Sequence, residues 1–207
     1  MFPDPAPALF GLVLTGGRSS RMGFDKSTID YHGRPQREYL YDRLSAYCRE
    51  VYLSVNPEQA ADLAGSRFRL ILDQAPVEGP MAGILSAFQR PSASERSAPA
   101  WLVVACDLPL LSEGSIRKLI EHRRTDKIAT AFWDSDHRFP EPSVCIWEPA
   151  AYPALLKAIE DRTPYPRRVL MNGPVQLVEI DDVRELSNFN DPVAVQRFGK
   201  PWNPDTV

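Results

Sequence analysis

Short apolar runs recur along the chain and are separated by polar or helical stretches. Residues 9–14 are apolar almost throughout, which is typical of a strand buried on both faces of a parallel sheet. Further runs of this kind follow at regular intervals. Strands are predicted at residues 9–14, 51–55, 68–72, 101–106, 128–132, 143–147 and 175–180.

Helices are predicted between most of these runs. Tyr39, Leu40, Leu44 and Tyr47 recur at three- and four-residue spacing, so residues 36–48 form a helix with one buried face. Proline at a first helical turn or serine at a cap marks other starts. Further helices are predicted at 57–63, 80–89, from 113 onward, 149–159, and one ending at 169–172. This alternation predicts an α/β fold with a doubly wound, mostly parallel sheet and helices on both faces.

Length and composition favour one globular domain. We predict that residues 1–207 form a single domain, with 1–8 and 201–207 frayed. The apolar fraction of 43% and the charged fraction of 25% are ordinary for such a domain. The net charge of -3 gives no overall attraction to nucleic acid or to an anionic membrane, so we expect neither as a partner.

The cysteines and the apolar pattern bear on location. Cys48, Cys106 and Cys145 are odd in number and widely spaced, which argues against a disulfide framework and a zinc site. The chain has no basic leader and no apolar run of the roughly 18 residues that a membrane span requires. We therefore expect a cytoplasmic protein.

Polar residues and glycines follow the predicted strands. In an open α/β sheet, ligands bind outside the carboxyl ends of the strands, so these residues are the candidates for a site. They are the stretch from Gly16 to Lys26, Asn56, Asp73, the turn from Gly79 to Gly83, and Asp107.

The stretch after the first strand is suited to a polyanion. Gly16 and Gly17 are followed by Arg18, Arg21 and Lys26, so backbone N–H groups and cations are delivered together. The spacing does not match a Walker loop, because the lysine comes too late. It does not match a dinucleotide fingerprint either, because the two glycines are adjacent. A nucleoside triphosphate is the expected ligand.

Asp107 follows the fourth predicted strand and is the candidate metal ligand. Mg²⁺ in proteins is held by one or two carboxylates together with phosphate oxygens and water, so one such aspartate is adequate. Lys26 and Arg21 are the candidates to neutralise the phosphates and the leaving pyrophosphate. The histidines have no metal-ligand spacing and are interpreted as surface residues: His32, His122 and His137.

The residues Leu-x-Gly-Gly-Arg-Ser-Ser-Arg-Met-Gly-x-Asp-Lys, at positions 14–26, resemble the signature of the molybdenum cofactor guanylyltransferases. The resemblance implies a Rossmann-like nucleotide-diphospho-sugar transferase fold, with Mg²⁺ on Asp107. Asp73 followed by Gly79-Pro80-x-x-Gly83 is similar to the family segment beside the guanine and the acceptor. We assign nucleotide binding to Leu14, Thr15, Gly16, Gly17, Arg18, Ser19, Lys26, Asn56, Asp73, Gly79, Pro80, Gly83 and Asp107.

The resemblance implies transfer of GMP from GTP to the phosphate of molybdopterin, with release of pyrophosphate. It also implies transient contact with cofactor-delivery or recipient molybdoenzymes. A cytidylyltransferase or a sugar-nucleotide pyrophosphorylase is an alternative with the same chemistry. A non-catalytic module that binds nucleotide or molybdopterin is another alternative, because the segment from Asn188 to Ala194 departs from the family pattern after Asn190.

Overall fold

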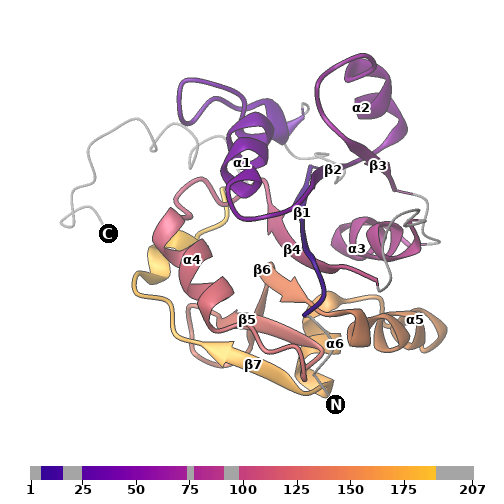
Figure 1. The fold of residues 1–207 in the computed structure, drawn as a ribbon, viewed down its shortest axis with the longest axis vertical. Helices are drawn as coiled ribbons and strands as arrows, with labels where there is room; N and C mark the ends of the chain where they lie inside the picture. The colour runs from indigo at the N-terminus through magenta and orange to yellow at the C-terminus, as the bar shows by residue number, and fades with distance from the viewer. Residues whose placement is uncertain (1–5, 16–24, 74–76, 91–97, 190–207) are drawn as a thin grey trace.

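Among the residues that the computed structural model describes, which are 6–15, 25–73, 77–90 and 98–189, seven strands form one sheet (Figure 1). The strand order is β3-β2-β1-β4-β6-β5-β7, and β6 is antiparallel to both of its neighbours while the other pairs are parallel. The bounds are β1 Leu9–Leu14, β2 Val51–Val55, β3 Leu70–Leu72, β4 Ala100–Ala105, β5 Ala129–Trp133, β6 Pro140–Trp147 and β7 Val175–Val178.

Helices cover both faces of the sheet, as expected for a doubly wound fold. The α-helices are α1 Gln36–Ser45, α2 Pro57–Asp62, α3 Pro80–Gln89, α4 Glu113–Glu121, α5 Tyr152–Glu160 and α6 Pro166–Asn172. Short 3₁₀ turns are η1 Lys26–Thr28, η2 Pro149–Ala151 and η3 Val183–Leu186. Apolar residues of α1 and α4 pack on one face, and those of α3, α5 and α6 pack on the other (Figure 1). The predicted fold class is confirmed.

Strand β1 lies between β2 and β4 and is buried on both faces. Phe10, Leu12 and Leu14 belong to the cluster that α3, α5 and α6 cover, whereas Val13 belongs to the opposite cluster. A side chain at Gly11 would lie 3.1 Å from a methyl group of Val51, so this glycine allows close packing over the strand. Burial from both sides explains why the sequence of β1 does not alternate.

Several predicted boundaries are displaced by a few residues. Helix α1 ends at Ser45 rather than at residue 48, although the N–H of Cys48 still donates to the carbonyl of Leu44 at 2.9 Å. Strand β3 begins at Leu70, because the ring of Phe68 packs instead against Tyr41 at a centroid distance of 5.0 Å. The strand after residue 174 ends at Val178, two residues earlier than predicted.

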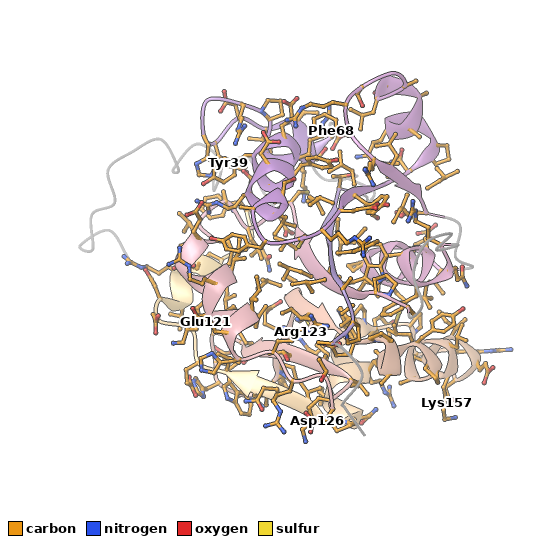
Figure 2. All side chains as sticks on the ribbon, in the orientation of Figure 1. Tyr39, Phe68, Glu121, Arg123, Asp126 and Lys157 are labelled. Carbon is orange, nitrogen blue, oxygen red and sulfur yellow. The ribbon has the colours of Figure 1, made fainter. Side chains whose placement is uncertain are left out.

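Pro7 and Ala8 do not fit the expectation of a frayed start. The carbonyl of Ala8 accepts a hydrogen bond from the N–H of Ala100 at 2.9 Å. The carbonyl of Pro7 accepts one from Arg123, whose place in the fold Figure 2 shows. Arg123 also forms a bidentate pair with the buried Glu148 at 2.6 and 2.9 Å. A buried ion pair thus holds the segment before β1. Of the remaining residues of the predicted frayed ends, Ala6 is exposed, and 1–5 and 201–207 lie outside the described part of the chain.

Within the described ranges, no helix combines the length and the apolar character needed to cross a bilayer.

Candidate active site

Four of the predicted site residues lie in a row at one edge of the sheet. Asp73, Asn56, Thr15 and Asp107 follow β3, β2, β1 and β4, which are neighbours and run parallel in this order. Backbone hydrogen bonds between neighbouring strands continue to this edge. The N–H of Thr15 donates to the carbonyl of Ser54 at 3.2 Å, and the N–H of Asp73 donates to the carbonyl of Val55 at 2.9 Å. With strands spaced about 4.8 Å apart, the row spans about 14 Å.

A cavity of about 520 Å³ opens at the β2 and β3 end of this row. It brings together three residues predicted to bind the nucleotide, Asn56, Asp73 and Gly79. Its volume lies within the range of small-ligand pockets. Gly79 precedes α3 with φ of 76°, a conformation that side chains other than glycine rarely adopt. The cavity is lined by Asn56, Pro57, Asp73, Val77, Glu78, Gly79 and Ala82.

Asp73 is half-buried, and its carboxylate accepts a hydrogen bond from a neighbouring strand. The hydroxyl of Ser54 donates to Asp73 Oδ1 at 2.7 Å. Burial raises the pKa of Asp73 from 3.8 to about 6, although the Ser54 hydrogen bond opposes the shift. A carboxylate in this state is suited to accept hydrogen bonds from a ligand that enters the cavity.

Gly83 supports this part of the site from below. A Cβ atom at this position would lie 2.2 Å from the hydroxyl oxygen of Ser54 and 2.8 Å from Leu14, so only glycine allows α3 to approach β1 and β2 this closely. Leu14 itself is buried in the core, whereas Pro80 is exposed at the first turn of α3. Leu14 and Gly83 therefore lie beneath the site, and any contact they make with a ligand is through the backbone.

The other end of the row carries Asp107 and Lys26. Both charges act on the buried thiol of Cys106, whose pKa is raised by burial first and then by Asp107 and by Asp25, with Lys26 opposing the rise. Burial, with Cys106 and Asp107, also raises the pKa of Tyr31 to about 12. The carbonyl of Asp107 accepts from the N–H of Phe189 at 2.9 Å. Lys26 and Asp107 therefore both lie close enough to Cys106 for their charges to act on its thiol.

A divalent cation fits the donors at this end. Asp107 supplies a half-buried carboxylate, the hard oxygen donor that Mg²⁺ prefers. Among the described residues there is no group of three or more His, Cys, Asp or Glu side chains placed to hold a metal. A cation here would take its remaining ligands from substrate phosphates and water.

Five predicted nucleotide-binding or catalytic residues lie outside the described part of the chain: Gly16, Gly17, Arg18, Ser19 and Arg21. Asn190 lies outside it as well.

A second polar group lies at the same edge and was not found from the sequence. Since β5 runs parallel to β4, its carboxyl end reaches this edge, and Asp134 follows it. Arg167 of α6 lies 3.3 Å from Asp134 and 3.5 Å from Glu141, and both carboxylates are buried. Burial would raise the pKa of Asp134, but hydrogen bonds from the N–H groups of Arg138 and Phe139 and the Arg167 charge lower it overall. No sequence spacing links these residues.

The histidine interpretation holds for two of three residues. His122 and His137 are exposed, whereas His32 is half-buried, stacks on Tyr39 with a centroid distance of 3.8 Å and bonds to the carbonyl of Pro109 at 3.0 Å. Burial lowers the pKa of His32. His32 is therefore better described as a packing residue.

Comparison with known proteins identifies the family. The model of the MobA-like NTP transferase domain matches residues 11–178. The chain belongs to this family. A Pseudomonas putida relative named "Molybdenum cofactor guanylyltransferase" is 30% identical over 203 residues, covering 94% of this chain and 99% of that one. The matched range contains all the predicted nucleotide-binding residues from Leu14 to Asp107.

Two other comparisons extend this result. A Synechocystis protein named "Molybdenum cofactor biosynthesis bifunctional protein" is 37% identical over 186 residues, and the match covers 89% of this chain but only 52% of that protein. The chain therefore spans about half the length of this relative. The crystal structure of molybdopterin-guanine dinucleotide biosynthesis protein A from Archaeoglobus fulgidus superposes with a TM-score of 0.72 at 21% identity, covering 91% of this chain and 96% of that one. This likeness establishes the fold.

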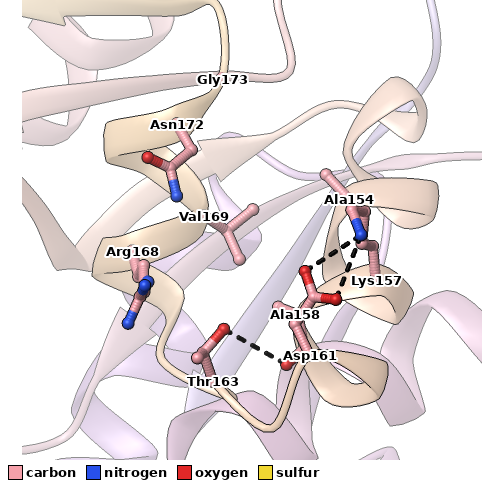
Figure 3. Close-up of a pocket in the computed structure, with 9 residues that line it drawn as sticks. All are labelled: Ala154, Lys157, Ala158, Asp161, Thr163, Arg168, Val169, Asn172 and Gly173. Carbon is pink, nitrogen blue, oxygen red and sulfur yellow. Dashed lines mark hydrogen bonds and ion pairs between the residues drawn. The ribbon is translucent and has the colours of Figure 1, made fainter.

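The chain has a second cavity, of about 250 Å³, between α5 and α6 (Figure 3). Lys157 pairs with Asp161 at its rim, and the hydroxyl of Thr163 donates to the carbonyl of Ala158 at 3.5 Å (Figure 3). None of the predicted nucleotide-binding residues lines it. The row from Asp73 to Asp107 is therefore the candidate active site.

Proposed function

We propose that the protein transfers GMP from GTP to the terminal phosphate of molybdopterin and releases pyrophosphate. The observation that carries this proposal is the row of Asp73, Asn56, Thr15 and Asp107 along four adjacent strand ends. The family match and the name of the Pseudomonas putida relative support the choice of GTP and of the molybdenum cofactor. The Gly16-Gly17 pair, which resembles guanylyltransferases, agrees with it.

The nucleotide would lie along the row with its nucleoside end in the cavity beside Asn56 and Asp73. The triphosphate would extend past Thr15 toward Lys26 and Asp107. The half-buried carboxylate of Asp73 would accept hydrogen bonds from N–H or O–H groups of the nucleoside. Residues 16–21 would contribute backbone N–H groups and the cations of Arg18 and Arg21 to the phosphates.

The reaction needs no protein nucleophile. An oxygen of the acceptor phosphate forms a bond to the α-phosphorus of GTP, and the bond from that phosphorus to the β-phosphate oxygen breaks, so pyrophosphate leaves. The acceptor oxygen is already anionic, and no general base is required. Catalysis then rests on alignment and on neutralisation of charge by Lys26 and by a cation on Asp107. When bound, Mg²⁺ would neutralise negative charge on the phosphate oxygens.

Location and partners form part of the same proposal. Cys48, Cys106 and Cys145 are free in the structure, which agrees with a reducing compartment such as the cytoplasm. Transfer of the product to molybdoenzymes would require transient contact with a delivery or recipient protein.

A panel of GTP, CTP, UTP and ATP tests the function, with pyrophosphate release measured with and without molybdopterin. We expect release from GTP at least about 10-fold faster than from the others, dependent on molybdopterin and abolished when EDTA removes divalent cations. A preference for CTP would contradict the proposed nucleotide. Binding of GTP without any release would contradict enzymatic function and favour a binding module.

A further inference from the structure

Gln59 on α2 joins three segments of the candidate active site. Its side chain is buried, with 7% of the residue exposed. The amide Nε2 donates to the carbonyl of Thr15 at 3.1 Å and to Asp25 Oδ2 at 2.9 Å. The amide Oε1 accepts from the N–H of Asn56 at 3.1 Å. One side chain therefore contacts Thr15 after β1, Asp25 before Lys26, and Asn56, which is one of the residues that line the cavity.

We infer that Gln59 is a positioning residue that sets the distance between the nucleoside end and the phosphate end of the site. The inference rests on the proposed function, since it concerns the same nucleotide. Thr15 and Asp25 are the two described residues that flank positions 16–24. The two bonds from Nε2, which we call the Gln59 bridge, hold them together and hold both against Asn56.

The partners of the Gln59 bridge are themselves fixed. Asp25 caps η1, with Oδ1 accepting from the N–H of Ser27 at 2.9 Å, and Oδ2 lies 3.4 Å from Arg37. The hydroxyl of Thr15 donates to the carbonyl of Ser54 at 2.5 Å. These side chains are engaged within the protein, so Thr15 and Asp25 act on the nucleotide through the backbone that they orient.

The amide of Gln59 fits this place in one orientation. Both Nε2 hydrogens meet acceptors, and Oε1 meets a donor. The reversed amide would place an N–H group against the N–H of Asn56 and an oxygen against two acceptors. The backbone N–H of Gln59 also donates to Asn56 Oδ1 at 2.9 Å, which completes the cap of α2.

The variant Gln59→Glu separates the bridge from the helix cap. Glutamate keeps an oxygen to accept from the N–H of Asn56 but replaces the donor with a second oxygen, which faces the Thr15 carbonyl and the Asp25 carboxylate. In the described part of the chain, the charged groups near it include Asp25 from the start of η1 and Arg37 from α1. Repulsion should break the bridge at pH 8. Protonation of the introduced carboxylate should restore a donor as the pH falls.

We expect Gln59→Glu to weaken binding of the nucleotide that the wild type prefers in the panel by at least about 10-fold at pH 8. The ratio of variant to wild-type Kd should narrow to within about threefold at pH 5.5. Using the ratio at each pH removes the contribution of Asp73, which both proteins share. The matched control is Ser112→Ala, which removes the cap that Ser112 provides to α4 at 3.1 Å and leaves the bridge intact. It should lower the melting temperature without changing affinity at either pH.

A second readout needs no nucleotide. Hydrogen exchange of the N–H groups of Ser27 and Ile29, which the Asp25 cap and η1 protect, should be about 10-fold faster in Gln59→Glu than in the wild type and unchanged in Ser112→Ala. Unchanged exchange, or a Kd ratio near one at pH 8, would overturn the role of Gln59. If the wild type binds no nucleotide, the proposed function fails while exchange still decides on the bridge.

Discussion

Folding shifts the pKa values of two aspartates at the same edge of the sheet in opposite directions. Asp73 follows β3, and among the described residues its carboxylate accepts a hydrogen bond from the hydroxyl of Ser54 at 2.7 Å. Asp134 follows β5, and its carboxylate accepts hydrogen bonds from two backbone N–H groups and pairs with Arg167. Burial dominates at Asp73 and raises its pKa to about 6, whereas the donors outweigh burial at Asp134 and lower its pKa.

The two aspartates therefore mark two different parts of this edge. In one part the polar side chains are paired within the protein, and in the other a carboxylate faces a cavity that can hold a ligand. The carboxylates of Asp134 and Glu141 pair with Arg167 and accept hydrogen bonds from backbone N–H groups of the protein, so the contribution of this group is to stability. The row from Asp73 to Asp107 presents the Asp73 carboxylate to a cavity, where a bound nucleotide can supply further hydrogen-bond donors. Perturbing each part should therefore affect a different property.

The largest effect is expected for Asp107→Asn. The neutral amide cannot hold a cation as the carboxylate does, so we expect pyrophosphate release to fall at least about 100-fold. Thermal unfolding should change little. Asp126→Asn is the matched control, because Asp126 is exposed and pairs locally with Arg124 at 2.8 Å. A variant at Asp107 with wild-type turnover would remove this residue from the mechanism.

Arg167→Met should destabilise the protein without weakening nucleotide binding. It leaves two buried carboxylates side by side, and because the Arg167 side chain is 42% exposed we expect a loss of only about 2 kcal/mol. Melting would then fall by roughly 4–8 °C at pH 7. Since the pKa of Asp134 is lowered by folding, this stabilisation is present above the unfolded pKa and is lost as the pH falls through the folded pKa.

The control for Arg167→Met is Arg184→Met, in which an exposed arginine loses its pair with Asp182. Its melting temperature should stay close to that of the wild type. A change in nucleotide Kd of more than about threefold in Arg167→Met would show that the second polar group belongs to the binding site.

Asp73→Asn should stabilise the protein and weaken nucleotide binding. The native state holds the Asp73 proton more tightly than the unfolded chain, so wild-type stability falls as the pH rises from about 4 to about 6. The rise in the pKa from 3.8 to about 6 sets an upper limit of about 3 kcal/mol, and partial exposure reduces it to about 1 kcal/mol. Melting of the variant should exceed that of the wild type at pH 8 and match it at pH 4, while nucleotide affinity at pH 8 falls about 10-fold. Lower melting at pH 8 would contradict the burial argument.

The smallest effect is expected from a methyl group placed beneath the row. Gly83→Ala places a Cβ against Ser54 and Leu14, so α3 must move, and we expect a loss of about 1 kcal/mol with a weaker Ser54–Asp73 bond. Gly114→Ala in α4 is the control, because the nearest atom lies at 3.5 Å, and helix propensity should make it neutral or stabilising. Equal melting temperatures for the two variants would show that α3 yields at no cost.

Local sequence patterns were sufficient to predict the strands and the polar residues that follow them. The apolar run of β1 and the Asn and Asp residues after β2, β3 and β4 predicted the sheet and the row at its edge. Such patterns were not sufficient for Gln59, whose partners Thr15 and Asp25 lie 44 and 34 positions away, because no spacing indicates such a contact. The group around Arg167 was missed for the same reason, since α6 and the β5–β6 turn meet only in the folded chain.

A crystal structure of the protein with a non-hydrolysable GTP analogue and Mg²⁺ would test the central claim most directly. We predict the nucleoside in the cavity beside Asn56 and Asp73, the phosphates past Thr15 toward Lys26, and the cation on Asp107. An analogue bound between α5 and α6, or one at the sheet edge with no cation on Asp107, would contradict the account.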